Sequence, residues 1–298
     1  MDYRRILREE RELSRRKNNA SRCDDSEEVQ SIRIKSTNPD IELKHSPGST
    51  GSNSRTLNFR FNPFNLESCR IGTAKSLFYV PNAIENVTEL HLLESVAISG
   101  LQHKNSWIQL KNRRLQSWGK SITGEVRDDE ALPKWLKEIA SALVDTNIFN
   151  DADLPDHVLI NEYGPADGIL HHTDGPLYRD VVAILSLGSP CLMTFKNKLE
   201  SHDIGCGDAG DVFSVVLQPR SLLVFTDSIY THFMHGIDSG MSHIVGASAP
   251  CLNMVQAVVS EDDEVDSLHF PLLSFFSNLH NFLLSFILLR LLGGKELL

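Results

Sequence analysis

The sequence predicts a mainly β or α+β domain in which two helices pack on a β-sandwich or barrel. The first helical pattern covers Val87–Ile98, and the second runs from Leu132-Pro133 to Leu143 with apolar residues at helical spacing. From residue 156 onward, short apolar runs alternate with Gly- and Pro-containing turns. Two helices followed by many short strands are typical of helices that cover one face of a sheet.

The expected strands are short and rich in β-branched and aromatic residues. A first β-like run, Ser76–Tyr79, precedes the helices. The later strands are expected at residues 157–163, 181–188, 191–195, 211–217 and 221–225.

Composition divides the chain of 298 residues into three parts. Residues 1–65 alternate charged residues with a Gly/Ser/Pro stretch, which predicts a disordered N-terminal tail. Residues 66–238 form the expected folded domain. Residues 239–298 are expected to be a divergent C-terminal tail that contains an apolar segment, 270–292.

Charge and cysteine content narrow the class of protein. The net charge of −10 disfavours general attraction to nucleic acid phosphates, although a local basic patch is compatible with it. The five cysteines include no Cys-x-x-Cys pair, which disfavours a disulfide scaffold and a thiolate zinc site. Reduced thiols and the absence of an apolar run at the N-terminus favour the nucleus or cytoplasm.

Two histidines and one aspartate form a candidate metal site. His172 and Asp174 are two residues apart, so on an extended strand both side chains project to the same side. His171 has the opposite parity. His235 supplies the third ligand, because His232 would face away on an extended segment. Two imidazoles and a carboxylate are the ligand set of non-heme iron(II) oxygenases. A His-x-Asp motif also arises by chance, with a core or surface histidine beside a turn aspartate.

The residues around this motif identify a family. The stretch VLINEYGPADGILHHTDGPLY, residues 158–178, resembles the corresponding part of the AlkB-like 2-oxoglutarate and iron(II) oxygenases. The resemblance continues through VAILSLGSP, LQPRSLLVF and SIYTHFMHGI and covers about residues 70–238. It implies a double-stranded β-helix, or jelly roll, with flanking N-terminal helices. It also implies that His172, Asp174 and His235 bind Fe(II).

The same resemblance implies the cosubstrates and the reaction. Asn161 and Tyr163, which also share strand parity, are expected to contact 2-oxoglutarate, and O2 is the oxidant. The implied activity is a dioxygenase that oxidatively demethylates N-methylated nucleobases in DNA or RNA. We expect a monomer with a nucleic acid substrate and no membrane.

Four residues are candidates for contact with that substrate. They lie in a basic stretch with tryptophans that is expected to form a lid: Arg113, Arg114, Gln116 and Trp118. A solvated polar loop is the alternative interpretation of this stretch.

The sequence departs from the family after the third ligand. The family continues into a strand that resembles Arg-x-Ser-Leu-Thr-x-Arg, whose arginines pair with the far carboxylate of 2-oxoglutarate. No such motif follows His235, which predicts weak cosubstrate binding and an unpaired sheet edge. The alternatives are therefore a catalytically impaired binding or regulatory module, or a protein hydroxylase. The apolar segment 270–292 is expected to pack on the exposed sheet, with a membrane anchor as the other reading.

Overall fold

The computed structural model describes residues 59–102, 107–119, 131–198 and 212–278. Of the predicted disordered tail, residues 1–65, residues 1–58 lie outside this part of the chain. Residues 59–65 lie within it, and Phe59 is buried against the helices, so the folded domain begins earlier than predicted.

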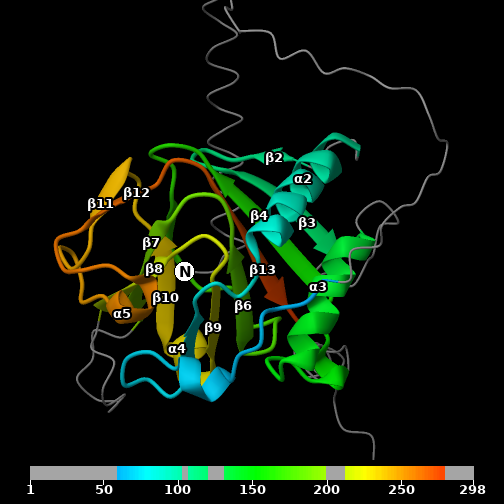
Figure 1. The fold of residues 1–298 in the computed structure, drawn as a ribbon, viewed down its shortest axis with the longest axis horizontal. Helices are drawn as coiled ribbons and strands as arrows, with labels where there is room; N and C mark the ends of the chain where they lie inside the picture. The colour runs from blue at the N-terminus through cyan, green and yellow to red at the C-terminus, as the bar shows by residue number, and fades with distance from the viewer. Residues whose placement is uncertain (1–58, 103–106, 120–130, 199–211, 279–298) are drawn as a thin grey trace, which may run out of the picture.

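Two sheets form the body of the domain (Figure 1). The larger sheet has seven strands in the order β1-β9-β6-β13-β4-β3-β2, and the smaller has four in the order β5-β10-β7-β8. All named strand pairs in them are antiparallel. A third pair consists of β11 and β12.

The larger sheet contains β1 Leu77–Val80, β2 Ile108–Gln109, β3 Arg114–Gly119, β4 His157–Tyr163, β6 Val181–Ser186, β9 Leu222–Thr226 and β13 Phe270–Phe276. The smaller sheet contains β5 Ile169–His172, β7 Cys191–Asn197, β8 Val212–Leu217 and β10 Phe233–Ile237. The third pair is β11 Ser242–Ile244 and β12 Glu264–Asp266. The helices are η1 Leu66–Cys69, α2 Asn86–Gln102, α3 Lys134–Asp145, η2 Asp151–Asp153, α4 Asp227–His232 and α5 Met254–Ala257.

Side-chain alternation along β4 shows how the layers are held together. Leu159 and Tyr163 belong to the apolar core between the two sheets, whereas Val158 and Ile160 belong to the core beneath α2 and α3. Because helices cover the outer face of the larger sheet, all seven residues of β4 are buried. The arrangement is the predicted jelly roll with flanking helices.

The predicted strands and helices are confirmed within one or two residues at most ends. The 157–163 prediction coincides with β4, and the second helix begins directly after Pro133. Its buried face contains Leu136, Ile139 and Leu143, as the apolar spacing predicted. Strands β2, β3, β5 and β10 to β13 were not predicted, because their sequences lack a simple alternation of apolar and polar residues.

The predicted unpaired sheet edge is wrong. Strand β13 lies between β4 and β6, where Leu273 is opposite both Ile160 and Leu185. Backbone hydrogen bonds form whatever the side chains, so a strand without arginines can fill the centre of the sheet. Residues 239–278, assigned from the sequence to a tail, therefore include a strand integral to the domain.

Only the first part of the apolar segment 270–292 belongs to the described domain. Its first residues form β13, and its remainder from residue 279 lies outside the described part. Among the described residues, no helix has both the length and the apolar character needed to cross a membrane.

The central position of β13 predicts a large effect of Leu273→Ala on stability. Leu273 is fully buried in the core beneath the helices, so the substitution leaves a cavity and should cost about 2–5 kcal/mol. Leu268→Ala is the matched control, since Leu268 lies just before the strand and is exposed. Urea unfolding of both variants measures the difference. Equal stabilities would show that β13 does not pair in the sheet.

Candidate metal centre

The pairing of two strands in the smaller sheet places the two predicted histidine ligands face to face. His172, the last residue of β5, is the antiparallel partner of His235 in β10. Their ring centroids are 4.5 Å apart. Gly236 allows this approach, because a Cβ at that position would lie only 2.9 Å from the backbone nitrogen of His171. Cross-strand register therefore sets the spacing of the two imidazoles.

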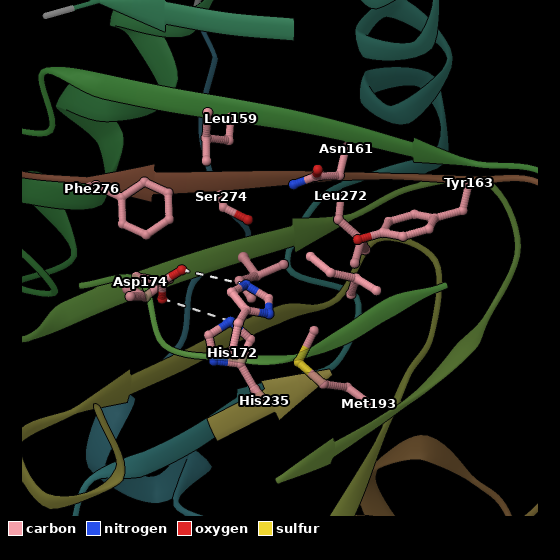
Figure 2. Close-up of a pocket in the computed structure, with 13 residues that line it drawn as sticks. Leu159, Asn161, Tyr163, His172, Asp174, Met193, His235, Leu272, Ser274 and Phe276 are labelled. Atoms are coloured by element: carbon pink, nitrogen blue, oxygen red, sulfur yellow. Dashed lines mark ion pairs between the residues drawn. The ribbon is translucent and has the colours of Figure 1, made fainter. Parts of the chain in front are cut away.

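Asp174 completes the group from the turn that follows β5 (Figure 2). Its Oδ1 lies 3.9 Å from His172 Nε2, and its Oδ2 lies 3.7 Å from His235 Nε2. The three candidate ligand atoms all lie within 4.8 Å of one another. They are therefore close enough to share one cation.

A backbone hydrogen bond orients His172. Its Nδ1–H donates to the carbonyl oxygen of Leu170 at 2.8 Å, which leaves Nε2 on the side of Asp174. A bond of this kind from the second ring nitrogen fixes the tautomer and raises the basicity of a ligating histidine. The rings of Phe195 and Phe225 lie 6.0 and 5.2 Å from that of His235 and give it an apolar surrounding.

Burial perturbs all three groups toward their uncharged forms. It raises the pKa of Asp174 to about 7, against a smaller opposing effect of Lys198. Burial lowers the pKa of His235 to about 4, and burial with the nearby His235 lowers the pKa of His172 well below its usual value. Asp174 Oδ2 is buried and has no hydrogen-bond partner among the described residues. A divalent cation would compensate this carboxylate and accept the neutral imidazoles, so the donor set fits Fe(II).

The two neighbouring histidines do not join the group. His171 is half-buried, with Lys196 and Asp238 among the charges that act on it. His232 ends helix α4. Within the described part of the chain, His172, Asp174 and His235 form the one such cluster of potential ligands.

A cavity of about 400 Å³, counted with the solvent at its mouth, opens beside the three ligands. Asn161 and Tyr163 line it from β4, on the same face, as their parity predicted (Figure 2). The other lining residues are mostly apolar: Leu159, Ile169, Val182, Ile184, Met193, Leu272, Ser274 and Phe276.

Three of these lining residues, Leu272, Ser274 and Phe276, belong to β13 and were missed in the sequence. Their i, i+2, i+4 spacing is the signal that one strand face holds all three. It could not be used, because nothing in the local sequence shows that this strand enters the main sheet.

The predicted lid over the substrate is a strand of the larger sheet. Gln116 and Trp118 lie on its outer face, where Gln116 Nε2 donates to the carbonyl of Val96 and Trp118 Nε1 donates to Gln116 Oε1. Trp118 belongs to the core beneath the helices. These two residues therefore do not reach the cavity. Polar residues in this stretch suggested an exposed lid, but the polar groups of Gln116 and Trp118 are buried and hydrogen-bonded within the domain.

The two arginines of this strand region have different surroundings. Arg113 is buried, and its Nε donates to Asn161 Oδ1 at 2.9 Å. Arg114 is exposed, pairs with Glu162 and lies over the ring of Trp107, 4.2 Å from its centroid. Arg113 is thus linked to the cavity through Asn161, whereas Arg114 lies at the surface.

Comparison with known proteins agrees with this geometry. The sequence profile of the 2OG-Fe(II) oxygenase superfamily matches residues 100–254. The chain belongs to this superfamily. The match begins before β3 and ends at the first residue of α5, so it includes both sheets apart from β1 and β13, and all three candidate ligands.

Relatives place the oxygenase among the AlkB-like proteins. It is 32% identical over 182 residues to the zebrafish (Danio rerio) "Probable RNA/DNA demethylase ALKBH6", an alignment that covers 58% of this chain and 76% of that protein. It is also 32% identical over 180 residues to mouse (Mus musculus) "tRNA (carboxymethyluridine(34)-5-O)-methyltransferase ALKBH8", covering 58% of this chain and 26% of that protein. The AlkB-like resemblance predicted from the sequence is confirmed. The motifs LFYVPNAI, RRLQSWG and LPKWL of this chain resemble AlkB homologue six in particular, in agreement with the zebrafish relative.

A solved structure of OsALKBH1 also aligns with the oxygenase, with a TM-score of 0.46 and 14% identity. The alignment covers 68% of this chain and 98% of that one.

Metal binding predicts a specific pattern of thermal stability. At pH 8, Mn(II) should raise the melting temperature of the wild type and of His171→Ala, but not of Asp174→Asn. The raised pKa of Asp174 means that its ionised form destabilises the fold, and this cost is complete above about pH 7. Asp174→Asn should therefore also regain roughly 1–2 kcal/mol without metal. A normal response of Asp174→Asn to Mn(II), measured by differential scanning fluorimetry, would contradict the site.

Proposed function

We propose that this AlkB-type oxygenase oxidatively demethylates N-methylated nucleobases in RNA or DNA. The observation that carries the proposal is the buried group of His172, Asp174 and His235 beside a cavity that opens to solvent. The name of the zebrafish relative supports the substrate class. We further propose that the protein acts as a monomer in the nucleus or cytoplasm.

The residues of the centre have defined roles in this proposal. When bound, iron, O2 and a 2-oxo acid supply the oxidation of a substrate C–H bond. His172, Asp174 and His235 would hold the metal from one side and leave its other positions open toward the cavity. The side chains of Asn161 and Tyr163 line the same space and can donate hydrogen bonds to the carboxylate or keto oxygen of the 2-oxo acid.

The apolar walls of the cavity protect the reaction from water. Val182, Ile184 and Met193 line it from both sheets, and the exclusion of water strengthens the polar contacts that remain. Hydroxylation of an N-methyl group gives an N-hydroxymethyl group, which releases formaldehyde and leaves N–H on the base. The chain has to orient the methyl group toward the metal and needs no further acid or base for this release.

The two arginines are the proposed contacts to nucleic acid. Arg114 presents an exposed guanidinium stacked on Trp107, an arrangement suited to a phosphate or an unstacked base. Arg113 is proposed to act closer to the reacting base, through its bond to Asn161. Gln116 and Trp118 contribute only by holding this strand against α2.

A second candidate function follows from β13. Its cavity face, Leu272, Ser274 and Phe276, carries no cationic side chain to pair with the far carboxylate of 2-oxoglutarate. This favours a metal-binding module with impaired turnover, if 2-oxoglutarate is the required cosubstrate.

A turnover assay tests the proposed function. Protein with Fe(II), ascorbate and a panel of 2-oxo acids that includes 2-oxoglutarate is incubated with N-methylated RNA and DNA oligonucleotides. Mass spectrometry should show loss of the methyl group with an equal amount of formaldehyde. His171→Ala should retain this activity, whereas His172→Ala should lower it at least about a hundredfold, since it removes a metal ligand. Wild-type turnover no greater than that of His172→Ala would refute demethylation.

A further inference from the structure

The end of the cavity formed by β13 is uncharged. Phe270, Leu272, Ser274 and Phe276 share one face of the strand, and the last three line the cavity. Phe270 stacks on Tyr163, with ring centroids 4.8 Å apart and an angle of 14° between the planes. In the family strand Arg-x-Ser-Leu-Thr-x-Arg, the arginines stand at the first and seventh positions, and β13, which also has seven residues, has phenylalanine at both.

The whole described lining of the cavity lacks a cation. Of its thirteen residues, the ionisable ones are His172, Asp174, His235 and Tyr163. Arg113 is a buried cation nearby, but it is not among the lining residues; its Nε is bonded to Asn161, and its charge lowers the pKa of His172. A second carboxylate in this cavity would lose its water without gaining an opposite charge from the described lining residues, which is strongly unfavourable.

Apolar side chains, in contrast, form most of the cavity wall. Leu159, Ile169, Val182, Ile184, Met193 and Leu272 supply its walls, and Figure 2 shows Met193 and Leu272 on opposite sides of the space beside Tyr163. The polar groups in the lining are the amide of Asn161 and the hydroxyls of Tyr163 and Ser274, together with the metal ligands.

We propose that the cosubstrate of this chain is a 2-oxo acid with an apolar side chain, such as 2-oxo-4-methylpentanoate, in place of 2-oxoglutarate. The inference rests on the proposed function in that it assumes an oxygenase, and it names the class of compound that the cavity accepts. The 2-oxo carboxylate end lies toward the metal group, and the side chain lies against the apolar walls.

The reaction balances with this cosubstrate. The bond between C1 and C2 of the 2-oxo acid breaks and releases CO2. One oxygen atom of O2 enters the new carboxylate, which is 3-methylbutanoate for the example above, and the other enters the substrate C–H bond as a hydroxyl. The 2-oxo acid and the substrate each lose two electrons, and O2 gains four.

Binding, measured without turnover, tests the inference. Isothermal titration calorimetry on the full chain loaded with Mn(II), without oxygen, compares 2-oxo-4-methylpentanoate with 2-oxoglutarate. The apolar acid should bind at least about tenfold more tightly, since only its side chain matches the uncharged walls. Phe270→Arg and Phe276→Arg, made separately, should each reverse the preference toward 2-oxoglutarate. Leu268→Arg, which adds the same charge at an exposed residue, should leave the preference unchanged.

Two results of the titration would overturn the inference. Tighter binding of 2-oxoglutarate by the wild type is one, and its loss in Arg113→Gln would then assign the second carboxylate to Arg113. Binding of Mn(II) without measurable binding of either acid is the other, and it would support the impaired module. Failure to demethylate nucleic acid leaves a measured preference for the apolar acid intact, because no nucleic acid takes part in the titration. Demethylation supported by 2-oxoglutarate alone would overturn the inference and leave the proposed function standing.

Discussion

The antiparallel pairing of β5 with β10 is the constraint on which the rest of the centre depends. It sets His172 opposite His235, and the turn after β5 brings the Asp174 carboxylate within 4 Å of both Nε2 atoms. Gly236 is required beside the third ligand because the strands approach too closely there for a side chain. The fold thus buries three polar groups, and the Asp174 carboxylate is too far from both imidazoles to hydrogen-bond to them. Burial shifts the pKa of each group toward its uncharged form. Such an arrangement is unfavourable without a cation and favourable with one.

Strand β13 keeps the sheet pairing expected of the family strand but lacks its arginines. Its backbone completes the larger sheet between β4 and β6, and this requires only extended geometry and apolar side chains. Its side chains shape the end of the cavity, and here phenylalanines, Phe270 and Phe276, stand where the two arginines of the family strand are expected. A stable jelly roll is therefore compatible with a changed cosubstrate, because the backbone of β13 forms the sheet hydrogen bonds while its side chains line the cavity.

Local patterns predicted the parts of the structure that local forces determine. Strand parity and the family resemblance together indicated His172 with Asp174 and Asn161 with Tyr163, and the structure places all four around one cavity, although β5 ends at His172 and Asp174 follows it. The errors lie where distant contacts decide. Gln116 was predicted to be a lid residue, but its side chain bonds to α2. Strand β13 was predicted to be part of a tail, because its partners in the sheet are 86 to 119 residues away in the sequence. No pattern within 270–276 shows those partners.

The most direct test of the metal centre is anomalous X-ray diffraction from crystals of the full chain grown with Mn(II). We expect one strong peak enclosed by His172 Nε2, His235 Nε2 and an Asp174 carboxylate oxygen, at coordination distances of roughly 2.0–2.3 Å. We expect no such peak in Asp174→Asn crystals. A peak elsewhere, or none between these side chains in the wild type, would contradict this metal centre.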